Sequence, residues 1–197
     1  MNVGRRQAPV LETERLRLRA HRLGDYAACV ALWTDPRVTQ FISGKPSTPA
    51  QTWSRMLSYG GHWSLLGFGH WAVVEKTSGS YVGELGFADH TRDIDSAMRD
   101  LPEAGWVLVP AMHGRGFATE ALRAALRWAD TTLEAARTVA LISPENTASL
   151  RVAEKLGYRE TAKSSYANKP TSFFERNAVK ACPEQPKRVY RYRRAIG

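Results

Sequence analysis

The chain has 197 residues, of which 43% are hydrophobic and 24% charged, a size and balance suited to one globular domain. No apolar stretch approaches the about 18 residues of a membrane-spanning helix, and the N-terminus lacks the apolar segment of a secretory signal. Two cysteines, Cys29 and Cys182, are too few for a disulfide framework, and no Cys/His spacing indicates zinc. These features favour a soluble cytoplasmic protein with no metal and no membrane contact.

The formal net charge of +9 is concentrated near the end of the chain. Residues 177–197 hold six basic residues and one acidic residue, whereas residues 7–176 carry a net charge of only +2. A basic tail favours weak binding to an anionic partner such as nucleic acid. A solvated extension without a partner explains the same composition, so both interpretations remain open.

The chain opens with one strand pattern and two helix patterns. Leucines alternate with arginines between Leu11 and Ala20, which predicts a half-buried strand. A helix is predicted from Asp25 to Thr34, where Pro36 ends it. A second helix is predicted from Thr48, a suitable cap, to Leu66.

The middle of the chain predicts three strands. Apolar runs at 71–75 and 81–88 flank the Ser- and Gly-rich segment 76–80, a pattern typical of a β-hairpin. A polar loop follows at 89–100. The third strand covers Glu103 to Val109 and stops before Pro110.

The last part of the chain alternates helices and strands. Alanines and leucines recur at helical spacing from Ala118 to Leu133, and a short β-branched strand follows at 138–142. A helix over 147–156 is closed by Gly157, and two strands are predicted at 158–165 and 171–175. The order βααβββαβαββ indicates a mixed α/β fold with a mostly antiparallel first half, and excludes a doubly wound sheet.

The segment between the 103–109 strand and the helix at Ala118 has the composition of an anion-binding turn. Gly114 and Gly116 let the backbone approach a bulky anion, and the free N–H groups of the helix start point at one place. Arg115 adds a positive charge. The phosphate-loop motif and the third glycine of a dinucleotide fingerprint are both absent. Gly-x-Gly alone is a weak signal for an anion site, and the helix that follows it directly strengthens this interpretation.

Several motifs in order resemble the GNAT acetyltransferase superfamily. Its acetyl-CoA signature, Gln/Arg-x-x-Gly-x-Gly/Ala, is similar to His113-Gly-Arg-Gly-Phe-Ala118, with His113 in place of the usual Gln or Arg. The branch most similar to this chain is that of the ribosomal-protein N-terminal alanine and serine acetyltransferases. The further motifs are Leu11-Glu-Thr-Glu-Arg-Leu-Arg-Leu-Arg19, Val82-Gly-Glu-Leu-Gly86 and Pro144-Glu-Asn-Thr-Ala-Ser-Leu-Arg-Val-Ala-Glu-Lys-Leu-Gly-Tyr158.

The resemblance covers residues 10–176, and sets them apart from an N-terminal extension, 1–9, and the basic tail, 177–197. It implies a mostly antiparallel sheet flanked by helices, with splayed central strands. It also implies transfer of an acetyl group from acetyl-CoA to a primary amine on a peptide N-terminus or a small molecule. The chain would act as a monomer or homodimer.

The resemblance implies a set of cofactor-binding residues, in which backbone groups dominate. The strand offers its backbone to the pantetheine arm, the turn holds the pyrophosphate, and two residues at the start of the helix over 147–156 lie near the thiol. These residues are Val107, Leu108, Val109, His113, Gly114, Arg115, Gly116, Phe117, Ala118, Thr119, Asn146 and Ser149. Asn146 is equally well explained as a helix cap alone.

The catalytic candidates are Glu103, Glu84 and Ser149. An ammonium cannot attack a thioester, so a base must take a proton, and Glu103 or Glu84 suits this role unless each is a surface carboxylate. Backbone N–H groups around Val109 are expected to stabilise the oxyanion. Many relatives hold a tyrosine acid where this chain has Ala153, so Ser149 or a water must replace it.

Other residues fit a structural role at least as well as a functional one. Glu120 is interpreted as a first-turn partner of the helix dipole. Trp63, Phe68, Trp71 and Trp106 fit either the core or an acceptor pocket. His70 and His90 carry no assignment. Two alternatives to the enzyme remain: a catalytically silent acyl-CoA-binding module, and a nucleic-acid-associated protein acting through the tail.

Overall fold

The computed structural model describes residues 7–92, 101–133 and 135–179. The predicted tail, 177–197, lies outside these residues from Lys180 onward, as do most of the N-terminal extension, 1–9, and of the polar loop, 89–100. Within the described residues, no helix combines the length and hydropathy needed to cross a membrane.

Eight strands form one sheet in the order β1-β2-β3-β4-β5-β6-β8-β7. All neighbours pair antiparallel except β5 and β6, which confirms the mixed, mostly antiparallel architecture. The strands are β1 (Leu11–Glu12), β2 (Leu16–Arg19), β3 (His70–Glu75), β4 (Tyr81–Ala88), β5 (Glu103–Leu108), β6 (Arg137–Ile142), β7 (Arg159–Tyr166) and β8 (Lys169–Asn177).

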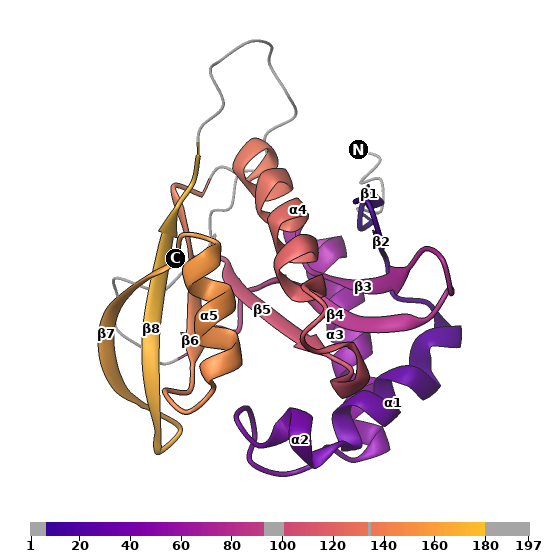
Figure 1. Cartoon of the computed structure of the whole chain (residues 1–197), viewed down its shortest axis with the longest axis horizontal. Coiled ribbons are helices and arrows are strands. Elements are labelled where there is room, and N and C mark those ends of the chain that lie inside the picture. Colours follow the sequence, from indigo (N-terminus) through magenta and orange to yellow (C-terminus); the bar gives the residue numbers. More distant parts are fainter. Residues whose placement is uncertain (1–6, 93–100, 134, 180–197) are drawn as a thin grey trace.

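Helices cover both faces of this sheet. Figure 1 shows α4 and α5 on one face, with α3 behind the opposite face. The helices are α1 (Tyr26–Thr34), α2 (Pro36–Thr39), α3 (Pro49–Leu66), α4 (Phe117–Thr132) and α5 (Thr147–Lys155), with short 3₁₀ turns η1 (Leu23–Asp25) and η2 (Pro110–Met112).

The single strand predicted between Leu11 and Ala20 is wrong, because two antiparallel strands occupy this segment. Thr13 closes the turn between them. Its N–H donates to the Leu16 carbonyl at 2.9 Å, and its hydroxyl oxygen accepts from the Leu16 N–H at 2.9 Å. The alternation in the sequence is continuous because both strands bury leucines on the same face of the sheet.

The observed helix ends agree closely with the predicted ones, and one further short helix, α2, is present. Thr48 and Gln51 cap the start of α3 reciprocally, and the helix runs to Leu66 as predicted. Pro36 follows α1 as expected, but it also begins α2 as its first helical residue. The Asp35 carboxylate caps α2 by accepting from the Arg37 N–H at 2.8 Å.

The core contains a cluster of tryptophans between the sheet and α4. Trp63, Trp71 and Trp128 meet edge to face, with ring centroids 4.7 to 5.4 Å apart. Trp63, Phe68 and Trp71 are all buried, which confirms the core interpretation over an acceptor pocket for these three, and Trp106 packs against the same core. Each such side chain contributes about 1.5–3 kcal/mol by leaving water.

The two halves of the sheet separate between β5 and β6. These strands share one ladder position, Glu103 opposite Val139, and one backbone bond from the Val139 N–H to the Pro102 carbonyl at 3.1 Å. Beyond that point they diverge towards Leu108 and Ile142 (Figure 1). The expected splay is confirmed, and the inner edge of β5 faces a gap where a sheet would normally continue.

Candidate active site

The turn between η2 and α4 presents unpaired backbone N–H groups. Gly114 and Gly116 have φ values of 75° and 80°, a left-handed conformation that favours glycine. The first helical hydrogen bond runs from the Glu120 N–H to the Gly116 carbonyl at 3.1 Å. The N–H groups of residues 117–119 therefore have no partner within the helix and are available to an anion.

Glu120 anchors this turn to the start of the chain. Its carboxylate accepts from the Thr13 hydroxyl at 2.6 Å and pairs with the Arg15 guanidinium at 2.6 Å. Arg15 also donates to the Arg115 carbonyl at 3.0 Å. Burial acts to raise the pKa of the Glu120 carboxyl, but the bonds from Thr13 and Arg15 lower it overall. The residue lies in the first turn of α4 as predicted, and its contacts hold the turn in shape.

Two side chains of the turn point back into the protein. The Arg115 guanidinium pairs with Glu75 at 2.6 Å and lies over the Phe117 ring, 4.4 Å from its centroid. The His113 Nε2 atom lies 3.0 Å from the Leu108 carbonyl oxygen. Both contacts join the turn to the sheet, so these two side chains already have partners and the expected anion site rests mainly on backbone groups.

The start of α5 lies at the same edge of the sheet as this turn, because β5 and β6 are parallel and both helices follow their carboxyl ends. The Asn146 side chain accepts from the Ser149 N–H at 3.1 Å, which confirms the cap. Ser149 is half-buried in the first turn. Ala153 is fully buried one turn further on, so no hydroxyl is available at that position.

Glu84 on β4 is fully buried, and both its oxygens accept hydrogen bonds. The Trp33 indole N–H donates to Oε1 at 2.8 Å, and the Tyr59 hydroxyl donates to the same atom. The Tyr81 hydroxyl donates to Oε2 at 3.0 Å. One carboxylate thus joins α1, α3 and β4.

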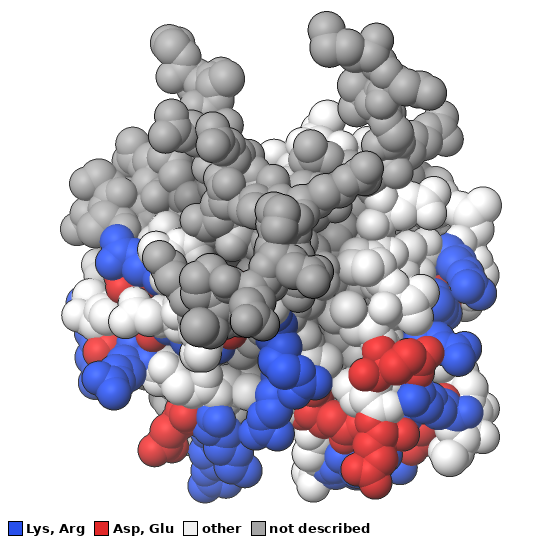
Figure 2. All heavy atoms as spheres, turned by 90° about the horizontal axis from the view of Figure 1, so that it is seen from above, with Lys and Arg blue, Asp and Glu red and all other residues white. Residues whose placement is uncertain are grey.

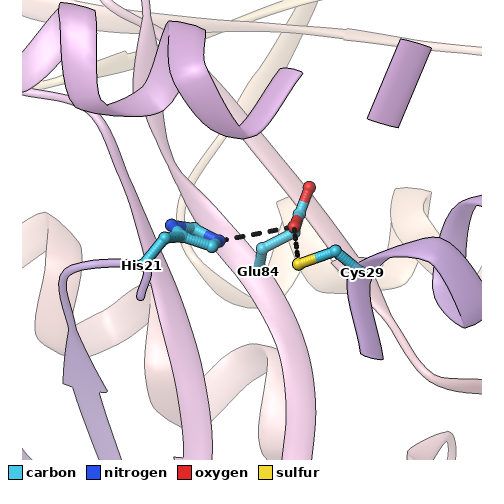
Figure 3. Close-up of side chains that lie close together, drawn as sticks. All are labelled: His21, Cys29 and Glu84. Carbon is cyan, nitrogen blue, oxygen red and sulfur yellow. Dashed lines mark hydrogen bonds and ion pairs between the residues drawn. The ribbon is translucent and has the colours of Figure 1, made fainter. Parts of the chain in front are cut away.

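Two more groups surround Glu84 Oε2. His21 Nε2 lies 3.4 Å away and the Cys29 sulfur 3.8 Å away (Figure 3). Burial acts to raise the pKa of the Glu84 carboxyl, but His21 and Tyr59 hold it at about 2. Burial raises the pKa of the Cys29 thiol to about 12, so it remains a donor. The trio has donor types found in metal sites, but the carboxylate is already satisfied by O–H and N–H groups, so we assign it a hydrogen-bonding role.

Glu103 lies in a different setting at the start of β5. Its side chain is 13% exposed, and Arg92 donates to both carboxylate oxygens at 2.7 and 2.9 Å. His90 Nε2 lies 4.0 Å away, and the Arg92 guanidinium covers the Tyr166 ring at 4.6 Å. Neither Arg92 nor Tyr166 lies in a motif, so no sequence pattern pointed to them.

His70 occupies the face of the sheet between the two glutamates. Its Nε2 atom lies 3.2 Å from the position that a Cβ on Gly105 would take, so the ring covers the middle of β5. The ring stacks on Tyr59 with centroids 4.8 Å apart, and its buried Nδ1 has no hydrogen-bond partner. Burial lowers the pKa of His70 to about 3, so the imidazole is neutral.

One expected oxyanion donor is already occupied. The Val109 N–H donates to the Val82 carbonyl at 2.9 Å and therefore faces β4. Because successive N–H groups of a strand point to opposite sides, those of Leu108 and Trp106 face the gap instead. Of the N–H groups expected around Val109, its own is therefore occupied, and those of Leu108 and Trp106 remain candidates for the oxyanion.

Comparisons with known proteins agree on one family. The profile of the GNAT acetyltransferase domain matches residues 15–159. The YkkB protein of Bacillus subtilis (strain 168) is 30% identical over 173 residues, which are 85% of this chain and 95% of that protein.

Solved structures give the same result. A protein described as a GnaT-family acetyltransferase from Bordetella pertussis superposes with a TM-score of 0.76 at 31% identity, covering 86% of this chain and 99% of that one. A spermidine N-acetyltransferase from Vibrio cholerae, solved with CoA and spermine, shares the fold with a TM-score of 0.66 at 16% identity, covering 84% and 97%. This chain belongs to the GNAT acetyltransferase family.

Proposed function

We propose that the protein is an N-acetyltransferase that moves an acetyl group from acetyl-CoA to a primary amine. The observation that carries the proposal is the splay between β5 and β6, which opens towards two helix N-termini at one edge of the sheet. An extended thioester with an anionic end fits such a gap, because its arm meets free strand groups and its phosphates meet free N–H groups.

The cofactor is proposed to lie along β5 from the turn towards the middle of the strand. The pyrophosphate binds the N–H groups from Gly114 to Ala118, with Thr119 beside it. The predicted contact at the His113 N–H is corrected, because this group already donates to the Pro110 carbonyl at 3.1 Å. The pantetheine arm follows the backbone of residues 107–109, and Asn146 and Ser149 lie near the thiol. Most of these contacts are to backbone, so the exchange of the usual Gln or Arg for His113 is tolerated.

The reaction is proposed as direct attack. The neutral amine attacks the thioester carbonyl, a C–N bond forms, the C–S bond breaks, and the oxyanion is held by N–H groups of Trp106 and Leu108. The amine loses its proton to a base, and the departing thiolate gains one. Since Ala153 offers no hydroxyl, Ser149 or a water supplies that proton.

Glu103 suits the role of base better than Glu84. Glu84 has a pKa of about 2 and both oxygens occupied, so it accepts a proton poorly and positions α1 and α3 instead. Arg92 also occupies both oxygens of Glu103, but this carboxylate is partly exposed where β5 meets β6, with His90 nearby to pass a proton onward.

The test is release of free CoA from acetyl-CoA over a panel of amines containing peptides with free N-termini, amino acids and polyamines. Polyamines are included because the Vibrio cholerae structural neighbour carries that activity in its name. The proposal predicts release above background with at least one class, and none with Gly116→Glu. If CoA binds but release of free CoA stays at background for every class of amine, the result would favour the catalytically silent acyl-CoA-binding module. The missing tyrosine hydroxyl at Ala153 would then explain the lack of activity.

A further inference from the structure

The side of α3 that faces away from the protein is apolar as well as exposed. At about 100° per residue, the positions within about 80° of Gly61 point outward, opposite the buried side of the helix. The α3 outer face, as we call it, consists of Trp53, Ser54, Leu57, Ser58, Gly61 and Leu65. Leu57 and Leu65 are 57% and 80% exposed. A helix with apolar residues on both sides is normally buried, so this face favours a partner.

The α3 outer face carries no charge, and its hydroxyl groups already have acceptors. The one charged residue of α3 is Arg55, whose guanidinium carbon lies 3.6 Å from the centroid of the Trp33 ring. The Ser54 and Ser58 hydroxyls donate to carbonyls of their own helix at 3.1 and 2.7 Å. In Figure 2, charged side chains gather in the lower half of the view. The described surface towards the upper right, where α3 lies behind the sheet of Figure 1, is mostly white.

Gly61, at the centre of this face, has no structural reason within the described part of the chain. A Cβ at this position would meet nothing within 4 Å there, and the residue does not have a left-handed φ. Glycine inside a helix is destabilising relative to alanine. A second helix that crosses α3 at Gly61 would explain the residue, because a missing Cβ lets two backbones approach closely.

We propose that the α3 outer face binds the same face of a second copy of this chain and so forms a homodimer. Trp53, Leu57, Gly61 and Leu65 follow one another at intervals of four residues, and ridges of this spacing interdigitate when two helices cross at about −50°. Leu57 and Leu65 lie equally far on either side of Gly61. A two-fold axis at Gly61 therefore places Leu57 of one protomer against Leu65 of its partner, and the face is complementary to itself.

Charge favours a second copy over other occupants of the α3 outer face. The chain has a net charge of +9, so two copies repel each other unless they meet through uncharged surface. A helix that lies on a membrane carries lysines and arginines beside its apolar side, and the outer face of α3 has neither. A strongly charged partner protein would find no opposite charge on this face.

The size of the α3 outer face suits a weak dimer. α3 has 18 residues and is about 27 Å long, and the Tyr26 ring of α1 meets the Trp53 ring edge to face at 5.5 Å. With helices about 10 Å apart, α3 and the adjoining part of α1 form a strip about 20 Å wide. Two copies would bury about 1,000 Å², the lower limit of a specific interface, so we expect a micromolar dissociation constant.

Sedimentation velocity of the full chain between about 1 and 200 µM tests the proposal, because this range spans a micromolar dissociation constant. The mass of the wild type should rise from 22.0 kDa towards twice that value. Leu57→Glu with Leu65→Glu brings like charges together across the two-fold axis and should leave only monomer. The matched control, Val10→Glu with Val179→Glu, adds the same charge at apolar positions that are 60% and 68% exposed outside this face, and should associate as the wild type does.

A third variant, Gly61→Gln, separates the interface from the stability of the fold. Glutamine is the better helix former, so the melting temperature of the monomer should rise by about 2 °C. The new side chain occupies the crossing point, so association should weaken at least about tenfold. A glycine with a role only inside its own chain would not give both results.

Several results would overturn the proposal. A wild type that stays monomeric at every concentration would do so, as would undiminished association of Leu57→Glu with Leu65→Glu or of Gly61→Gln. An equal loss in the control would indicate an effect of net charge alone. Binding of a monomeric wild type to phosphatidylcholine vesicles, lost in Leu57→Glu with Leu65→Glu, would assign the face to a membrane instead. None of these readouts depends on acetyl transfer, so the proposed function stands or fails separately.

Discussion

The cofactor side and the acceptor side of the splay are built in different ways. The proposed cofactor side is one continuous segment, residues 108–119, whose N–H groups and glycine conformations would form the anion site. The proposed acceptor side is assembled from the side chains of Glu84, His70 and Glu103, whose partners His21, Tyr59 and Arg92 come from separate parts of the chain. The first side should therefore tolerate side-chain changes that keep the backbone, and the second should not.

The largest expected effect is on the cofactor side, at Gly116. Gly116→Glu places a β-carbon at a φ of 80° and a negative charge beside the phosphates. Two like charges about 4 Å apart at an effective dielectric of about 20 repel by about 4 kcal/mol, or about 1000-fold in affinity. Calorimetric titration with CoA checks this. Gly60→Glu, which adds the same charge at an open position on α3, is the control and should bind as wild type does.

On the acceptor side, Glu84→Gln should destabilise the fold. The amide leaves the Trp33, Tyr59 and Tyr81 donors competing for one carbonyl oxygen in a fully buried site, a loss of about 3 kcal/mol. Urea unfolding measures this loss in the free energy of unfolding. Glu103→Gln is the matched change at the other carboxylate and should cost clearly less. Equal losses would show that the two glutamates do not differ as described.

The main effect of Glu103→Gln should be on the rate of acetyl transfer and not on the stability of the fold. Removal of a general base slows transfer by about 100-fold, most strongly at low pH, because at high pH the amine is already neutral in solution. The pH profile of kcat/KM measures the effect. A profile parallel to that of the wild type would remove Glu103 from the proton path.

Substitution of His70 should have a smaller effect, on the pH dependence of the free energy of unfolding. The folded protein keeps this imidazole neutral because its pKa is lowered from 6.5 to about 3, whereas the unfolded chain takes up a proton below about 6.5. The free energy of unfolding therefore falls as the pH drops from 6.5 towards 3, by up to about 1.4 kcal/mol per pH unit. His70→Phe keeps a ring against Tyr59 and should reduce this slope. The same slope in both proteins between about pH 6.5 and 5 would contradict the assignment.

The smallest effect is expected at His113. Its ring contacts the Leu108 carbonyl, and its backbone N–H donates to the Pro110 carbonyl at 3.1 Å, so neither group is proposed to contact the phosphates. His113→Gln restores the residue usual in the family signature and keeps a hydrogen-bond donor. CoA affinity should change by less than about threefold, within about 0.7 kcal/mol. A change of tenfold or more would mean that the side chain itself contacts the cofactor.

The cofactor side could be predicted from the sequence because its information is local. Gly114, Gly116 and Pro110 fix the turn, and the helix follows within a few residues. The split between β1 and β2 was missed because continuous alternation hides a turn closed by Thr13. The partners of Glu84 and Glu103 could not be predicted, since they depend on which elements pack together.

The central claim is that the splayed strands and the adjoining turn transfer an acetyl group to an amine. It is tested most directly by mass spectrometry of the amine panel after incubation with isotopically labelled acetyl-CoA. We predict a labelled N-acetyl product from wild type, none from Gly116→Glu, and an undiminished product from Gly60→Glu. Complete absence of labelled product from the wild-type protein, with CoA binding intact, would contradict it.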